Sequence, residues 1–217
     1  MRHVTIPAAL EESRVVAILR RTEARMAVET AEALLRGGIS VIEVTLNTSG
    51  ALEMLRAIRD AVGDRAVLGA GTVLDMAAAD AALKAGAQFI VSPHTDVVLV
   101  RDMASRGVPC IPGAFTPTEV LTAWRAGASV VKLFPAGPVG ASYLRDLRGP
   151  LADIPLLPTG GVTLDNAASF MAAGAWGLGL GSALVAPDLV AAGRFDELTR
   201  RAAAFAAIAA SAVPIQR

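Results

Sequence analysis

Short aliphatic runs recur along the chain and are closed by Gly, Pro or Thr. Runs of about four to eight such residues are typical of strands buried on both faces of a parallel sheet. They predict eight strands, at residues 15–20, 40–46, 66–72, 88–93, 108–115, 130–135, 154–161 and 176–182.

Ala- and Leu-rich stretches with charged residues at helical spacing lie between these runs, and several end in Gly, as helix C-termini prefer. Strict alternation of strand and helix predicts a parallel sheet with right-handed crossovers. Eight units predict an α/β fold, a single (β/α)8 TIM barrel in one domain over residues 1–217. An open doubly wound sheet is the alternative, but residues 15–24 (VVAILRRTEA) lack the glycines of its fingerprint. The tail, residues 194–213, predicts one further amphipathic helix.

Composition and charge narrow the partners of this chain. The chain has 20 Lys and Arg residues and 20 Asp and Glu residues, so no basic excess favours a nucleic-acid partner. The single cysteine, Cys110, allows no intrachain disulfide, the N-terminus is no secretory signal, and no stretch approaches a membrane span. We therefore expect a soluble cytoplasmic protein whose partner is a small molecule or a copy of the same chain.

Residues 130–135 (VVKLFP) carry one of only two lysines in the chain, Lys84 and Lys132, inside a run otherwise suited to burial. Val131 and Leu133 face one way, so Lys132 should point into the barrel. Burial should lower the pKa of Lys132 and leave a free amine that can form an imine with a ketone, which arginine cannot do. A structural Lys–Glu pair is the alternative.

The second predicted strand holds a carboxylate in an apolar setting. If Ile42 and Val44 pack against helices, Glu43 and Thr45 point into the barrel, on the same side as Lys132. A buried carboxylate is costly unless it is paired, hydrogen-bonded or protonated. Glu43 is thus a candidate acid–base group, and a structural ion pair is again the alternative.

Other strand ends supply further candidates, because the sites of such barrels lie at the C-terminal ends of the strands. Arg20 ends the first run and suits a carboxylate or a phosphate, whereas Arg21 is interpreted as a surface residue. Thr72 ends the third run. His94 ends the fourth, and we predict no metal site there because no ligand cluster accompanies it. Phe115 is expected to form an apolar wall.

Glycines precede a helix start at the ends of the seventh and eighth runs. Gly160 and Gly161 end one of them, and Gly181 with Ser182 ends the other. Several backbone N–H groups can converge on one oxyanion in such loops. Phosphate sites are frequent in these two positions of a barrel, so we predict one here.

An inward lysine, a nearby carboxylate and a phosphate site together indicate a class I aldolase that acts on a phosphorylated 2-keto acid without a cofactor. Two alternatives stay open. One is another phosphate-binding barrel, an isomerase or synthase that uses Glu43 only as a base. The other is a non-catalytic sugar-phosphate-binding barrel with a structural Lys–Glu pair.

Seven motifs, in order between about residues 14 and 185, resemble the 2-keto-3-deoxy-6-phosphogluconate (KDPG) aldolase family: VIEVTL, GAGTV, FIVSPH, IPGAFTPTE, VVKLFPA, LPTGGV with LDN, and GLGSALV. The resemblance implies cleavage of that sugar acid to pyruvate and glyceraldehyde 3-phosphate by a homotrimeric barrel. It implies Lys132 as the Schiff-base lysine and Glu43 as the acid–base group. Arg20 and Thr72 would bind the carboxylate. Further substrate-binding positions would be Thr45, Pro93, Phe134, Thr159, Gly160, Gly161, Gly181 and Ser182.

Two positions bear on the substrate. Asn47 stands where some family members have an arginine, so the ligand-binding role of that arginine cannot be transferred. Galactonate-cleaving relatives resemble a VGG sequence where this chain has Thr159-Gly160-Gly161. A threonine hydroxyl there favours the gluconate epimer over the galactonate epimer. Cleavage of 4-hydroxy-2-oxoglutarate is expected as a side reaction.

Overall fold

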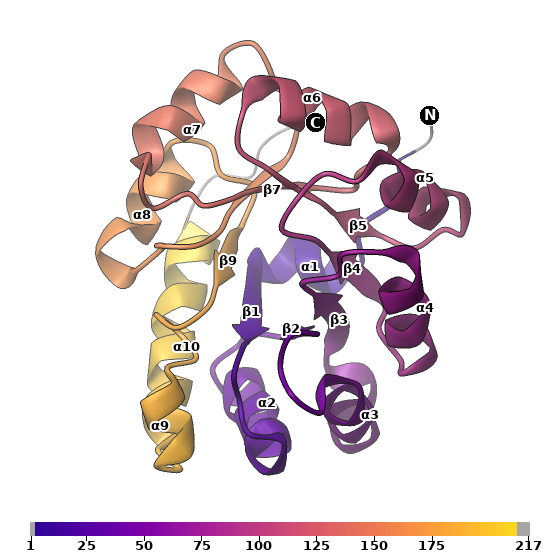
Figure 1. Ribbon diagram of the computed structural model, residues 1–217. Coiled ribbons are helices and arrows are strands. Elements are labelled where there is room, and N and C mark those ends of the chain that lie inside the picture. Colours follow the sequence, from indigo (N-terminus) through magenta and orange to yellow (C-terminus); the bar gives the residue numbers. More distant parts are fainter. Residues whose placement is uncertain (1–2, 212–217) are drawn as a thin grey trace.

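The computed structural model describes residues 3–211, in which strands and helices alternate around a closed ring (Figure 1). The strands are β1 (Val15–Leu19), β2 (Val41–Thr45), β3 (Val67–Gly71), β4 (Phe89–Val91), β5 (Cys110–Ile111), β6 (Gly113–Ala114), β7 (Val131–Leu133), β8 (Leu156–Pro158) and β9 (Leu178–Leu180). The helices are α1 (Ala8–Ser13), α2 (Ala27–Arg36), α3 (Ala51–Val62), α4 (Met76–Lys84), α5 (Val97–Ser105), α6 (Pro117–Ala126), α7 (Gly140–Arg148), α8 (Leu164–Ala172), α9 (Pro187–Ala191) and α10 (Phe195–Ser211), with short 3-10 turns η1 (Ala24–Met26) and η2 (Gly63–Arg65).

All strand pairs are parallel, in the orders β5-β4-β3-β2-β1-β9 and β6-β7-β8. Two features join these segments into one barrel. First, β5 and β6 are two parts of the fifth predicted strand, which is interrupted at Pro112. A bridge between Thr159 and Gly179 links β8 to β9. The predicted (β/α)8 barrel is confirmed, and the predicted domain, residues 1–217, extends beyond the described residues at both ends.

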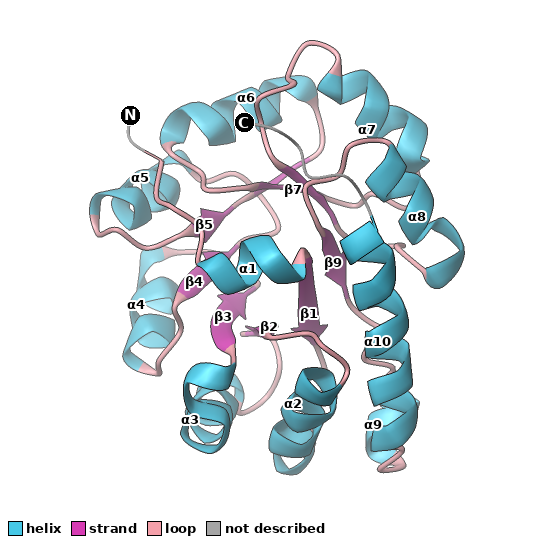
Figure 2. Cartoon of the chain, turned by 180° about the vertical axis from the view of Figure 1, so that it is seen from behind, coloured by secondary structure: helices cyan, strands magenta, loops and turns pink. Residues whose placement is uncertain are grey.

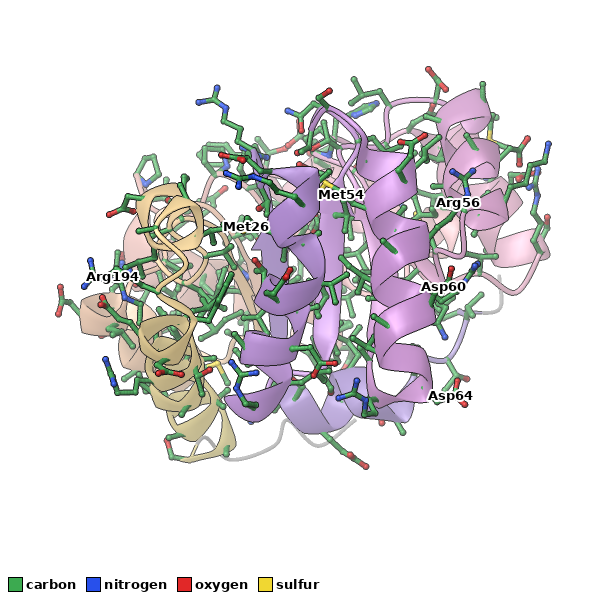
Figure 3. All side chains as sticks on the ribbon, turned by 90° about the horizontal axis from the view of Figure 1, so that it is seen from below. Met26, Met54, Arg56, Asp60, Asp64 and Arg194 are labelled. Carbon is green, nitrogen blue, oxygen red and sulfur yellow. The ribbon has the colours of Figure 1, made fainter. Side chains whose placement is uncertain are left out.

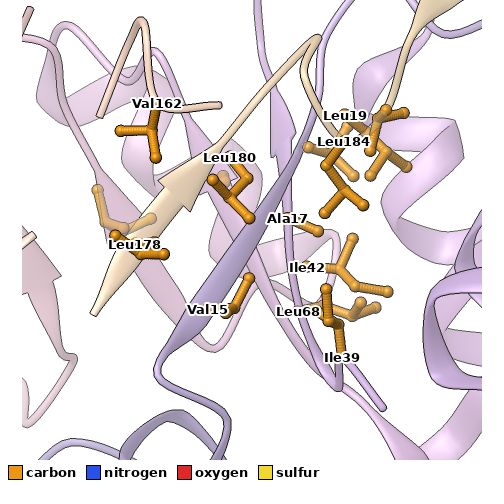
Figure 4. Close-up of a cluster of buried hydrophobic side chains, with 14 of the residues drawn as sticks. Val15, Ala17, Leu19, Ile39, Ile42, Leu68, Val162, Leu178, Leu180 and Leu184 are labelled. Carbon is orange, nitrogen blue, oxygen red and sulfur yellow. The ribbon is translucent and has the colours of Figure 1, made fainter. Parts of the chain in front are cut away.

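The barrel interior and its outer surface carry different side chains, because successive strand residues point to opposite sides. Val16, Val41, Phe89, Ile111 and Leu157 belong to an inner cluster. The outer cluster fills the space between strands and helices, and Figure 4 shows part of it. Ile42, Val44, Val131 and Leu133 belong to this outer cluster, as the strand pattern predicted.

Helix α1 closes the N-terminal end of the barrel. Its Leu10 and the preceding Ile6 are both buried in the inner cluster, and the helix contacts β1 and β2. Figure 2, in which the molecule is seen from behind, shows α1 leading into β1. Entry from this end is therefore blocked by apolar side chains.

Helix α10 corresponds to the predicted tail helix and packs against α2 and α8. Thr199 donates a hydrogen bond to the carbonyl of Ala33 at 3.0 Å, and a Cβ on Gly37 would overlap Ala202. Figure 3 shows this group of helices from below, next to α3. Residues 212 and 213 of the prediction lie outside the described residues. No helix within residues 3–211 has both the length and the apolar character that crossing a bilayer requires.

Candidate active site

Lys132 on β7 and Glu43 on β2 both point into the barrel, since their strand neighbours belong to the outer cluster. The exposed fractions are only 3% for Lys132 and 2% for Glu43. The ammonium nitrogen of Lys132 lies 5.0 Å from the ring centroid of Phe134. No ion pair within 4 Å joins Lys132 to Glu43 in residues 3–211, so the two groups act on each other over a longer distance.

Burial controls the protonation of both groups. It lowers the pKa of Lys132, against the opposing charge of Glu43, and the positive charge of Arg20 lowers that pKa further. It raises the pKa of Glu43, which Lys132 and Arg20 oppose. Both shifts favour the uncharged forms, a free amine beside a protonated carboxyl. This is the state in which a lysine is nucleophilic and a neighbouring acid can give up a proton.

The end of β3 makes room for Glu43. A Cβ at Gly71 would overlap the Glu43 carboxylate, so the close approach requires glycine there. Thr72, the next residue, has a φ of 55°, in the left-handed region that β-branched residues rarely adopt. Such strain costs roughly 1–3 kcal/mol and is often found at functional sites. Thr72 is partly exposed at this turn.

A cavity of about 620 Å³ opens at the C-terminal ends of the strands. Its walls come from the segments that follow β7, β8, β9, β1 and β2, which are neighbours in the ring. Eight of the predicted site residues line it: Arg20, Lys132, Phe134, Thr159, Gly160, Gly161, Gly181 and Ser182. Predicted site residues that are far apart in the chain therefore meet at one cavity.

Four predicted residues do not line the cavity: Glu43, Thr45, Thr72 and Pro93. The hydroxyl of Thr45 is fully buried, donates to the carbonyl oxygen of Leu19 at 3.3 Å and lies 3.0 Å from the hydroxyl of Thr48. These contacts hold the Thr45 side chain inside the protein, and its role in ligand binding stays a prediction.

The cavity also includes residues that were not predicted for the site. Arg21 was interpreted as a surface residue, and it is indeed exposed as well as lining the cavity, while Asn47 was interpreted as the loss of an arginine. The loop after β9 lines the cavity as far as Pro187, beyond Gly181, which marked the start of this loop in the sequence. The additional lining residues are Ile18, Arg21, Asn47, Val162, Thr163, Gly179, Ala183, Val185 and Pro187.

The loops after β8 and β9 present backbone donors to the cavity. Gly160 and Gly161 both have a φ of +80°, and a Cβ on Gly161 would lie 2.6 Å from the Cα of Gly137. In the described part of the chain, no acceptor within the protein pairs with the amides of Gly161, Val162, Ser182 and Ala183 in these two loops. Converging free N–H groups of this kind bind oxyanions.

His94 and Phe115 lie away from the cavity lining. His94 is exposed, and its Nδ1 lies 3.0 Å from the hydroxyl of Ser92. Phe115 stacks on Tyr143, with the ring centroids 5.7 Å apart. Thr116 caps α6 together with Glu119. No group of three or more His, Cys, Asp or Glu side chains in residues 3–211 is arranged to hold a metal ion.

Comparison with known proteins identifies this arrangement. The family model for KDPG and KHG aldolase matches residues 6–201. The chain is 40% identical over 197 residues to the 2-dehydro-3-deoxy-phosphogluconate aldolase of Treponema pallidum, covering 90% of this chain and 93% of the relative. It is 38% identical over 192 residues to the 2-dehydro-3-deoxy-6-phosphogalactonate aldolase of Escherichia coli, covering 88% of this chain and 91% of the relative.

A solved structure agrees with these relatives. The KDPG aldolase of Legionella pneumophila, with pyruvate captured as a covalent carbinolamine intermediate, superposes with a TM-score of 0.85 at 28% identity, covering 91% of this chain and 96% of that one. The chain therefore belongs to the KDPG and KHG aldolase family, the aldehyde-lyases of class I that act through a Schiff base.

Proposed function

We propose that this protein cleaves 2-keto-3-deoxy-6-phosphogluconate to pyruvate and D-glyceraldehyde 3-phosphate through an imine on Lys132. The observation that carries the proposal is a buried lysine, with a lowered pKa, in the wall of a cavity that also presents free backbone N–H groups. The amine supplies the nucleophile, and the N–H groups supply a site for the phosphate.

The reaction would start with attack of the Lys132 nitrogen on the C2 ketone. Glu43 gives a proton to the departing hydroxyl, so that the carbinolamine loses water and leaves an imine. The resulting carboxylate takes the proton of the C4 hydroxyl. The C3–C4 bond then breaks, its electron pair passes to the imine, and glyceraldehyde 3-phosphate leaves. Protonation of the enamine at C3 and hydrolysis of the imine release pyruvate and regenerate the amine.

The two ends of the substrate would bind to different loops. Arg20, which lines the same cavity as Lys132, would hold the C1 carboxylate through its guanidinium group. Thr72 would assist it, in the strained turn beside Glu43. The phosphate would bind to the loops after β8 and β9, with Gly160, Gly161, Gly181 and Ser182. Phe134 and Pro93 would form apolar walls.

Thr159 is the proposed determinant of the preferred epimer. Its hydroxyl donates to the carbonyl oxygen of Leu157 at 3.2 Å, and the residue lines the cavity, so a lone pair remains to accept a hydrogen bond from the substrate. The gluconate and galactonate compounds differ at C4, whose hydroxyl becomes the aldehyde oxygen. We therefore expect the gluconate epimer to be cleaved with the higher kcat/KM.

Steady-state cleavage of both epimers, followed as pyruvate release, tests this preference. Thr159→Val should lower kcat/KM for the gluconate epimer by about 10-fold, the value of one hydrogen bond, and affect the galactonate epimer less. Thr122→Val, on α6, is the matched control because its hydroxyl only donates to the carbonyl of Thr118. A wild-type preference for the galactonate epimer would refute the assignment.

Three further proposals follow from the family. The protein would cleave 4-hydroxy-2-oxoglutarate more slowly, because that compound lacks the phosphate. It would assemble as a homotrimer, which light scattering on an eluting column peak tests directly. It would act in the cytoplasm, in keeping with its single buried cysteine.

A further inference from the structure

Two adjacent arginines end β1 and line the same cavity. Arg20 is exposed, and its charge acts on the pKa values of Lys132 and Glu43, which are both buried. Arg21 follows it in the turn to α2. Because β1 lies between β9 and β2, this turn runs between the Gly-rich loop after β9 and the segment that holds Asn47.

The lining of the cavity is strongly unbalanced in charge. It contains two guanidinium groups, those of Arg20 and Arg21, together with the Lys132 amine, and no Asp or Glu. Within residues 3–211, no ion pair within 4 Å engages Arg20 or Arg21. Both guanidinium groups are therefore available to an anionic ligand, and two of them suit a ligand with an anion at each end.

The backbone of Arg21 is held in an unusual conformation. Its φ is 56°, in the left-handed region that favours glycine. The amide of Arg21 donates to the hydroxyl oxygen of Thr48 at 3.1 Å, and Thr48 is itself buried. This contact crosses from the loop after β1 to the loop after β2, so the second loop fixes the first.

Thr48 is part of a chain of hydrogen bonds whose direction is determined. The carbonyl oxygen of Leu19 can only accept, so Thr45 donates to it, at 3.3 Å. The hydroxyl of Thr45 has then used its proton, so Thr48 must donate in the 3.0 Å contact between the two hydroxyls. Thr48 accepts in turn from the amide of Arg21. The chain therefore connects the last residue of β1 to the turn that carries Arg21 and satisfies each buried hydroxyl.

We propose that Arg21 is a specificity-determining residue that binds the phosphate end of the substrate, and that Thr48 is the positioning residue that holds it over the cavity. This inference rests on the proposed function, because it assumes a phosphorylated 2-keto acid. Arg20 takes the carboxylate next to Lys132, Arg21 takes the phosphate together with the free N–H groups after β8 and β9, and the missing arginine at Asn47 is not required.

The test compares a phosphorylated substrate with its unphosphorylated counterpart, 2-keto-3-deoxygluconate. Arg21→Ala should raise KM and lower kcat/KM for the phosphorylated substrate by about 10- to 100-fold, the range for a charge-assisted hydrogen bond, with a change below about threefold for the unphosphorylated one. Arg21→Gly should change KM and kcat/KM in the same way, and glycine adopts the positive φ at this position without strain. Arg101→Ala, an exposed arginine of α5, is the matched control.

Thr48 is tested by two substitutions of similar size. Thr48→Val removes the hydroxyl and should raise KM for the phosphorylated substrate but not for the unphosphorylated one. Thr48→Ser keeps the hydroxyl and should have the wild-type KM for both substrates. A Thr48→Val variant that loses activity equally on both substrates would show a merely structural role and overturn this part of the proposal.

Trapping with pyruvate and borohydride separates this inference from the proposed function. If wild type forms a pyruvyl adduct on Lys132 and Arg21→Gly keeps the wild-type kcat/KM ratio between the two substrates, the role of Arg21 is refuted and the aldolase stands. If wild type forms no adduct, the proposed function itself fails, and the role of Arg21 fails with it.

Discussion

The helices on the two sides of the barrel differ in how their N-termini are capped. On one side, α4, α5 and α6 begin with side-chain caps from Asp75, Asp96 and Thr116. On the other side, α2, α3, α7 and α9 begin without a side-chain cap bond in the described structure. The cavity opens over this second side.

The difference shows how one ring supports both stability and binding. A capping side chain uses up the backbone N–H groups at a helix start, which fixes the loop but leaves fewer donors for a ligand. Loops without such caps keep their donors, and the free amides after β8 and β9 lie on this side. Helix α8 is the exception, since Asn166 accepts from the amide of Thr163 although Thr163 lines the cavity. We expect substitutions on the two sides to separate activity from stability.

The largest effect is expected at Lys132. Lys132→Met should lower kcat by about 10⁴-fold or more, because the nucleophile is lost, and should leave the fold intact because a buried cation site is replaced by an apolar chain of similar length. Lys84→Met, an exposed position at the end of α4, is the matched control. Pyruvate release and circular dichroism check the two parts. Substantial turnover by Lys132→Met would contradict imine chemistry.

Glu43→Gln should lower kcat by about 10²–10⁴-fold, the usual contribution of an acid–base group. It should also change how stability depends on pH. Burial raises the native pKa of Glu43 above its ordinary value of 4.5, so its contribution to stability is complete below pH 4.5 and is lost as the pH rises through the native pKa.

Urea denaturation of wild type and Glu43→Gln at a series of pH values measures this loss. The unfolding free energy of wild type, relative to the variant, should fall by up to about 1.4 kcal/mol per pH unit above pH 4.5 and then level off. A difference that does not vary with pH would mean that the native pKa is not raised.

The smallest effect is expected on the capped side. Asp96→Ala removes the side chain that accepts from the amides of Val98 and Leu99 at the start of α5. It should lower the free energy of unfolding by about 0.5–2 kcal/mol while kcat/KM stays at the wild-type value. Asp153→Ala, in the exposed loop between α7 and β8, is a control that removes a carboxylate without removing a cap. A loss of kcat/KM in Asp96→Ala would contradict the separation of the two sides.

The sequence predicted those features that depend on local periodicity. The alternation along β2 and β7 was sufficient to place Glu43 and Lys132 inside the barrel, because a strand has a period of two. Gly160 marked its loop because few residues other than glycine adopt its positive φ, and Gly181 marked the start of the loop after β9. Substrate roles for these residues remain predictions.

Features that depend on contacts between distant segments could not be predicted in this way. The hydroxyl of Thr45 is used by Leu19 and Thr48, which only the pairing of β1 with β2 brings together. That the exposed Arg21 also lines the cavity could not be predicted, because its positive φ and its hydrogen bond to Thr48 have no sequence signal. The interruption of the fifth strand at Pro112, by contrast, has a local signal, because proline has no backbone N–H to donate to a neighbouring strand.

The most direct test of the account is covalent trapping. The protein is incubated with pyruvate and borohydride, which reduces an imine to a stable secondary amine, and the modified peptide is identified by mass spectrometry. We expect one pyruvyl adduct, on Lys132 and not on Lys84. A folded protein that gives no adduct, or gives it on Lys84 alone, would contradict the central claim that the buried lysine forms the Schiff base.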